Sequence, residues 1–305
     1  MTDPLSRPRL PFGAMPFSML LDEAMRHTRR HFKTIYPAVA IPLALLAAAT
    51  GVLQALWFQG LTSRTGLGAS PLWSVQTILL GFAQGIVMAI GLIALQKAAV
   101  DATAGRPVDM KEAWRFAVRA PVLGTLFLHG LALIASVLAC LFPVFYVAPL
   151  LSLVPVIMAE EQIFGGAALS RSAALTRYNP QGRFFETPLV KALALMLVTA
   201  VISYAVAFLV VLPFQIPMFI SIFRDAAAGK DTAATMGSMS KWFWIQIPSQ
   251  ILQSLTTVAV YLYAAFGYAL LFFDARSRKE GSDLAAEIHT VFGSGPPPLP
   301  GEPLR

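Results

Sequence analysis

Long stretches without a charged side chain divide this chain, and they constrain its fold more than any other feature. These stretches are residues 35–59, 72–96, 121–158, 192–220 and 242–273. A helix needs roughly 20 apolar residues to cross the hydrocarbon core of a bilayer. Only 13% of the 305 residues are charged, whereas a soluble domain has about a quarter. We therefore expect a membrane protein, because a water-exposed surface needs more charge than this chain supplies.

The third stretch, of 38 residues, is too long for one span. Pro143 lies near its middle, where it favours a turn. A division there gives two short spans, at 121–141 and 144–158, and a total of six. Pro149 and Pro155 follow in the second of these, so a broken or re-entrant helix is an alternative. The predicted organisation is a tail at 1–16, an all-α membrane domain of six transmembrane helices at 17–288, and a Pro/Gly-rich disordered tail at 289–305.

Basic residues are distributed unevenly between the loops that six spans leave on the two sides. With the N-terminus in the cytoplasm, 19 of the 23 Lys and Arg residues fall on the cytoplasmic side. The remaining four are Arg64, Arg224, Lys230 and Lys241. Cytoplasmic loops of membrane proteins are enriched in Lys and Arg. The distribution therefore predicts six spans with both termini in the cytoplasm. The chain has a net charge of +7, and the position of its basic residues beside the spans favours anionic lipid over nucleic acid as its binding partner.

Three segments next to the spans have the pattern of amphipathic helices. Before the first span, Phe17, Leu21 and Phe32 fall on one helical face, and basic side chains face away. Similar segments occur at 109–119 and 166–178. We expect the first to lie in the cytoplasmic headgroup layer and to contact membrane lipids. Packing on the protein's own loops is the alternative.

Two cytoplasmic segments combine acidic and basic residues in a distinctive order: VPVIMAEEQIFGGAALSRSAALTR at 154–177 and YALLFFDARSRKEGSDL at 268–284. Together they resemble a bacterial family of six-span proteins, described as the membrane domain of glycerophosphoryl diester phosphodiesterase-like proteins and related to the uncharacterised YciC-like membrane proteins. The matching residues are Glu160 or Glu161, Ala168, Leu169, Arg171, Ser172, Leu175 and Thr176, then Phe273, Asp274, Arg276, Arg278, Lys279, Glu280, Gly281 and Asp283. The chain departs from the family at 178–180, where a glycine is usual.

The resemblance implies a six-span fold in the bacterial cytoplasmic (inner) membrane, and it implies no activity. Some family members are fused to a phosphodiesterase domain, but the 305 residues leave no room for one. We therefore do not transfer that activity, and we expect the chain not to be an enzyme.

The acids in the two family segments need an explanation beyond topology, because acidic residues contribute little to orientation. They can pair with the basic residues around them or dock a partner. The candidate docking residues are Glu160, Glu161, Arg171, Ser172, Asp274, Arg276, Arg278, Lys279, Glu280 and Asp283.

A second group of candidates lies within the spans. Gln246, Gln250, Gln253 and Thr257 recur at helical spacing in the last span. Such a stripe is unfavourable against lipid, so it should face the interior of the bundle. It either lines a substrate cavity or forms hydrogen bonds between helices, with Gln84 or Gln215 as partners. His129, in the third span, is a further intramembrane candidate.

Other patterns are less specific. Gly81 and Gly85 form a GxxxG motif in the second span, which predicts close packing against another helix. His27 and His31 share a helix face, but the arginines around them disfavour a metal. The single cysteine, Cys140, excludes a disulfide within the chain.

These observations favour a non-enzymatic accessory or scaffold protein that uses its cytoplasmic face to hold lipid or another membrane protein, such as a transporter component. We expect no cofactor, no metal and no nucleic-acid partner. The alternative is a transporter or exporter of a small or lipidic solute, suggested by the polar stripe and by the prolines that interrupt several spans.

Overall fold

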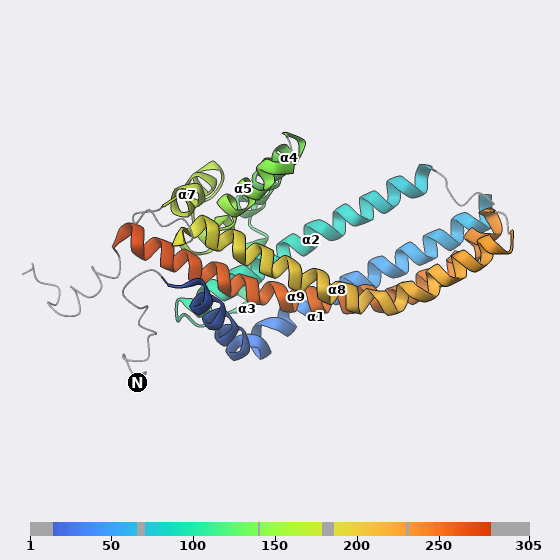
Figure 1. Cartoon of the computed structure of the whole chain (residues 1–305), viewed down its shortest axis with the longest axis horizontal. Coiled ribbons are helices and arrows are strands. Elements are labelled where there is room, and N and C mark those ends of the chain that lie inside the picture. Colours follow the sequence, from blue (N-terminus) through green and yellow to red (C-terminus); the bar gives the residue numbers. More distant parts are fainter. Residues whose placement is uncertain (1–14, 66–70, 140, 179–185, 230–231, 282–305) are drawn as a thin grey trace, which may run out of the picture.

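The computed structural model describes residues 15–65, 71–139, 141–178, 186–229 and 232–281. Side chains at 58–77, 141–142, 226, 232–243 and 280 are outside this description. In the part of the chain described, the regular structure is helical throughout (Figure 1). The helices are α1 (Phe17–Thr65), α2 (Pro71–Thr103), α3 (Met110–Ala117), α4 (Ala120–Ala139), α5 (Leu141–Leu151), α6 (Val154–Glu161), α7 (Gly166–Thr176), α8 (Pro188–Ala227) and α9 (Thr232–Glu280).

Six helical segments of the described chain are long and apolar enough to cross a membrane. They are Phe17–Trp57, Ile78–Thr103, Ala120–Ala139, Pro143–Glu161, Pro188–Asp225 and Trp244–Lys279. The predicted all-α, multi-pass bundle is thereby confirmed. The fourth segment is made of α5 and α6, which are separated by a turn at Ser152 and Leu153. Pro155 lies in the first turn of α6, where the missing N–H of proline is tolerated.

α9 is the central helix of the bundle. In the most apolar 18-residue stretch of α9, 61% is buried inside the protein. The corresponding share is 11% in α8 and 22% in α2. Two side chains from neighbouring helices donate hydrogen bonds to its backbone. Tyr36 of α1 donates to the carbonyl of Leu255 at 3.2 Å, and Gln96 of α2 donates to the carbonyl of Ala265 at 3.1 Å. α9 therefore lies against α1 and α2 at two separate points along its length.

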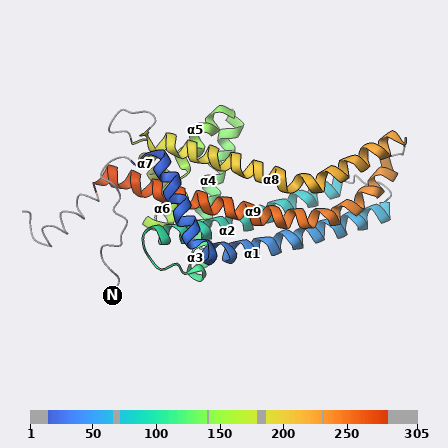
Figure 2. The ribbon, with the colours of Figure 1, turned by 60° about the horizontal axis from the view of Figure 1, so that its bottom comes forward.

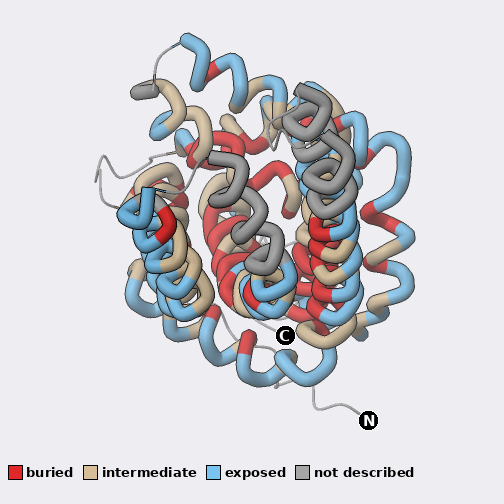
Figure 3. The backbone as a smooth tube through the Cα atoms, turned by 90° about the vertical axis from the view of Figure 1, so that its right-hand side faces the viewer, coloured by how far each residue is buried: buried red, intermediate tan, exposed pale blue. Residues whose placement is uncertain are grey.

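The well-packed core lies at one end of the bundle, which we call the α7 end. There α1 and α8 begin, α2 and α9 end, and α3, α6 and α7 lie at the same end (Figures 1 and 2). The core includes the fully buried Ile157 and Met158 of α6 and Phe266 and Phe272 of α9. Figure 3 shows this buried backbone inside a more exposed outer ring. Outer apolar side chains suit lipid, because hydrocarbon tails are as apolar as they are.

The hairpin of α4 and α5 is much shorter than its neighbours. It covers only the half of the bundle nearest the α7 end, whereas α2 and α8 continue to the opposite end (Figure 1). Helices α1, α2, α8 and α9 therefore form the other half without a fifth helix.

The amphipathic beginning of α1 packs on the protein. In Figure 2 this segment, in dark blue, crosses α9 at a steep angle before the rest of α1 runs beside α9. Pro37 and Pro42 lie inside the helix near the bend, and proline removes a helical hydrogen bond. The predicted apolar face is covered in part, since Ala24 is fully buried and Phe17 and Leu21 are half-buried, whereas Phe32 is exposed. The predicted amphipathic face therefore contacts the bundle rather than lipid alone.

Three glycines permit close contact between the long helices. A Cβ atom would lie 2.8 Å from Gln250 Oε1 at Gly51, 2.9 Å from Leu43 Cδ1 at Gly91, and 2.8 Å from Leu195 Cδ2 at Gly267. These positions bring α1 to α9, α1 to α2, and α8 to α9. A larger side chain at any of them displaces a packed neighbour.

We expect Gly267→Val to destabilise the protein by about 1–3 kcal/mol, because overpacking forces the buried Leu195 side chain to move. The measurement is the melting temperature of the detergent-purified protein. Gly130→Val in α4 is the matched control, since a Cβ there meets nothing within 4 Å. Equal melting temperatures for the two variants would contradict the packing role of Gly267.

Candidate functional site

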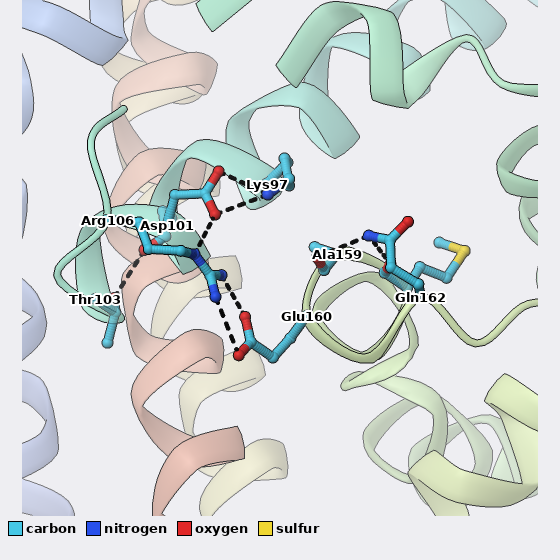
Figure 4. Close-up of polar contacts among 9 residues, drawn as sticks. Lys97, Asp101, Thr103, Arg106, Ala159, Glu160 and Gln162 are labelled. Atoms are coloured by element: carbon cyan, nitrogen blue, oxygen red, sulfur yellow. Dashed lines mark hydrogen bonds and ion pairs between the residues drawn. The ribbon is translucent and has the colours of Figure 1, made fainter. Parts of the chain in front are cut away.

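Two adjacent acids at the end of α6 pair in different directions. Glu160 accepts two hydrogen bonds from the guanidinium of Arg106, in the segment after α2. Arg106 also donates from Nε to Asp101 at 2.9 Å, and Asp101 accepts from Lys97 Nζ at 2.7 Å. Figure 4 shows this chain of charges between the end of α2 and α6. Hydrogen bonding to Glu160 raises the pKa of the Arg106 guanidinium, so its charge is constant.

Glu161 links α6 to two other helices. It accepts from Arg171 of α7 at 2.8 and 2.9 Å, which is the bidentate geometry that favours Arg over Lys. Arg276 of α9 lies 3.8 Å from the same carboxylate. The side chain of Gln162 then caps α6 by donating to the carbonyls of Met158 and Ala159, and its backbone is left-handed at φ 55°. This turn directs the chain into α7.

Asp274 is the centre of a third group of charges. It pairs with Arg278 one turn later on α9 and with Lys191 Nζ of α8 at 3.5 Å. It also accepts the backbone N–H of Met15 at 3.2 Å, and Lys191 donates to the Met15 carbonyl. Asp274 and Lys191 are only 4% and 2% exposed. The start of α8, the end of α9 and the residues before α1 are thus joined at a buried site.

Five of the ten predicted docking residues pair with one another, namely Glu161 with Arg171 and Arg276, and Asp274 with Arg278. Glu160 pairs instead with Arg106, which was not predicted. Of the others, Ser172 is buried and donates to the carbonyl of Leu150 at 2.7 Å, and Lys279 donates to the carbonyl of Ala174 at 3.1 Å. The Glu280 side chain and Asp283 lie outside the described residues. Sequence reasoning did not single out Asp101 or Lys191 as pairing residues. The spacing of Lys97 and Asp101, four residues apart in a helix, was the available signal for the first.

The polar stripe of the last span borders a cavity. The cavity has a volume of about 330 Å³ and lies between α1, α2 and α9. Its described lining is Leu43, Leu46, Gly81, Gln84, Gly85, Met88, Gln250, Gln253, Ser254 and Thr257. We call it the polar cavity. Among the lining residues described, hydrogen-bonding side chains are uncharged amides and hydroxyls.

A second cavity lies along α8 and shares one residue with the first. Its volume is about 750 Å³, and we call it the apolar cavity. Its described lining is Tyr204, Ala205, Ala207, Phe208, Val211, Leu212, Gln215, Phe219 and Gln253. Gln253 borders both cavities, so one residue of α9 contributes to the lining of each.

The other predicted intramembrane residues differ in their surroundings. Gln250 borders the polar cavity and also donates to Gln54 Oε1 of α1 at 3.4 Å. Gln246 donates to Met218 Sδ of α8 at 3.4 Å, outside the described lining of either cavity. His129 lies on α4, apart from the stripe, and its Nδ1 is buried without a hydrogen-bond partner in the described structure. The stripe therefore includes both cavity-lining residues and helix-to-helix contacts.

The packing role predicted for the GxxxG motif is wrong. A Cβ atom on Gly81 or Gly85 would meet no heavy atom within 4 Å, because both glycines face the polar cavity. Their missing side chains create space instead of a helix contact. Close packing occurs at other glycines, including Gly51 and Gly91.

The histidine pair of α1 packs on an aromatic ring. His27 and His31 are stacked with centroids 6.3 Å apart, and they lie 5.6 and 6.0 Å from Phe266 of α9. Within the described residues, no three His, Cys, Asp or Glu side chains are grouped so that they could hold a metal ion.

Comparisons of the chain with family models, curated proteins and solved structures gave no match. The candidate sites therefore rest on their own geometry.

Asp274→Asn should destabilise the protein by about 3–5 kcal/mol, because it leaves the buried Lys191 with an uncompensated charge. The readout is the melting temperature in detergent at constant pH and salt. Arg26→Gln is the control, since the Arg26 side chain is 75% exposed and exposed pairs contribute little. A melting temperature for Asp274→Asn equal to that of the control would contradict a structural role for these charges.

Proposed function

We propose that this chain is a non-enzymatic protein of the bacterial inner membrane that binds a small or lipidic solute within the bilayer and moves it across. The observation that carries this proposal is the polar cavity. Hydrogen-bonding side chains are unfavourable at membrane depth unless they have partners. Here several of them line a cavity of about 330 Å³, a volume within the range of ligand sites.

The geometry of the cavity supports solute binding over simple helix pairing. Gln84 of α2 and Gln250 of α9 line the same space, and the glycines of α2 keep that space open. A structural hydrogen bond between helices needs contact between the two side chains and no cavity. An amide lining can instead exchange hydrogen bonds with a bound polar group.

The charged residues at the α7 end pair within the chain, which supports a structural role for them over the docking of a partner. Glu160, Glu161 and Asp274 pair with bases of this same chain. An acid that already accepts bidentate hydrogen bonds has less capacity left for a partner. We therefore place the accessory or scaffold function second.

The accessory function retains one supporting observation. The outer face of the first part of α1 exposes basic residues, with Arg29 and Arg30 exposed beside Arg26. Such a face can hold anionic lipid or an acidic surface of another membrane protein. The family resemblance of the segments at 154–177 and 268–284 is compatible with either function.

The proposed orientation places the α7 end in the cytoplasm. It is supported by the excess of basic residues in the segments that connect the spans there. A green fluorescent protein fused after Arg177 should fluoresce in bacteria, and alkaline phosphatase fused there should be inactive. Fusions after Gly229, at the opposite end, should give the reverse pattern. An active phosphatase after Arg177 would overturn this orientation.

The cavity residues should control retention of a bound molecule. We expect native mass spectrometry of the protein, purified in mild detergent, to detect a non-covalent adduct. Gln250→Leu combined with Gln253→Leu should remove it, and Thr257→Val should reduce its affinity about fivefold, as expected for the loss of one hydrogen bond. Thr256→Val is the matched control, because that hydroxyl donates to carbonyls of its own helix. An adduct equally abundant in all variants, or absent from the wild type, would count against the proposal.

A further inference from the structure

We infer that the polar and apolar cavities form one lateral site for a neutral amphiphile, with its uncharged headgroup in the polar cavity and its hydrocarbon chain along α8. This inference rests on the proposed function and names the class of its solute. The starting point is Gln253, which borders both cavities. A molecule bound at this residue can reach both spaces at once.

The two cavities differ in chemistry in the way that the two parts of an amphiphile differ. Around Gln253, the polar cavity presents Ser254, Thr257 and two further glutamines. The apolar cavity presents mainly aliphatic and aromatic side chains, among them Phe208 and Leu212. Amides and hydroxyls bind hydroxyl, ester or amide groups, whereas the α8 surface offers contacts to a hydrocarbon chain.

The described lining of both cavities lacks charged residues, and this selects an uncharged headgroup. A phosphate or carboxylate taken from water into an apolar environment is strongly unfavourable unless it is paired with a cation. Uncharged groups such as glycerol hydroxyls need only the hydrogen bonds that these amides supply. A diacylglycerol is therefore favoured over a phospholipid with the same chains.

The fold leaves this site open to the side of the bundle. The α4–α5 hairpin covers only the half nearest the α7 end (Figure 1). On α8, Tyr204 is 78% exposed although it lines the apolar cavity. An amphiphile can therefore reach the site from the bilayer without passing through water.

The lining of the polar cavity suits a headgroup better than a partner helix. Three glutamine side chains line it. Their amides need hydrogen-bond partners at membrane depth, and an apolar transmembrane segment does not supply them.

The test uses two photoactivatable, clickable probes with identical acyl chains, a diacylglycerol and the corresponding phosphatidic acid. The full-length protein is reconstituted in phosphatidylcholine vesicles containing either probe, irradiated and analysed by peptide mass spectrometry. Gly85→Leu should fill the polar cavity and Ala207→Trp the apolar one, each lowering diacylglycerol labelling about tenfold. Gly130→Leu is the matched control, because a Cβ there also meets nothing within 4 Å and it lines neither described cavity.

Diacylglycerol labelling of α8 and α9 peptides, in excess of phosphatidic acid labelling, would support the inference. Equal or stronger labelling by phosphatidic acid would overturn the uncharged headgroup while leaving lipid transport intact. Labelling unaffected by Ala207→Trp would overturn the joined site. Failure of both probes, together with a polar adduct that Gln250→Leu removes, would overturn the inference but leave the proposal of a small solute. Crosslinks between α2 helices of two copies, in place of lipid labelling, would also overturn it.

Discussion

Ion pairs at the α7 end connect helices that otherwise meet through apolar contacts, and the pair of Asp274 with Lys191 is buried. In lipid, apolar side chains gain little by leaving the bilayer for the protein interior, so packing and polar contacts must hold a bundle together. Glu160 and Glu161 connect short α6 to α2, α7 and α9, and Asp274 connects α9 to α8. In the buried pair, Asp274 and Lys191 compensate each other's charge, since a buried charge alone is strongly unfavourable. The fully buried core of α6 and α9 lies directly beside these pairs.

The packing of the α7 end affects how tightly the other half of the protein needs to pack. Once the α7 end fixes the helices, their opposite halves are free to remain less tightly packed. The α4–α5 hairpin stops short, and Gly81 and Gly85 of α2 meet no neighbour. This is the half in which the two cavities occur. A firmly held end and an open, polar interior are what a solute-binding membrane protein requires, because the site must admit and release its ligand while the bundle stays folded.

Much of the fold could be predicted from the sequence, because membrane insertion depends on local properties. Charge-free stretches of sufficient length specify spanning helices, and this holds whatever their neighbours are. The candidate sites were predicted less completely. The stripe from Gln246 to Thr257 was identified by its helical period, but its division between a cavity and a contact with Met218 depends on where α2 and α8 lie. For the same reason GxxxG indicated helix packing, although a Cβ atom at either glycine would meet no heavy atom within 4 Å.

The sequence by itself determined that the chain is a helical, multi-pass membrane protein. It also determined which polar or charged residues lie within or beside the membrane-spanning helices. Length, hydropathy and period are properties of each segment alone. Only the tertiary structure decided that Glu161 pairs with both Arg171 and Arg276, and that Gln253 lies where two cavities meet. Apart from the pair of Glu161 with Arg171, those contacts join residues far apart in the chain. They depend on helix crossing and on the length of α4 and α5, which no local pattern encodes.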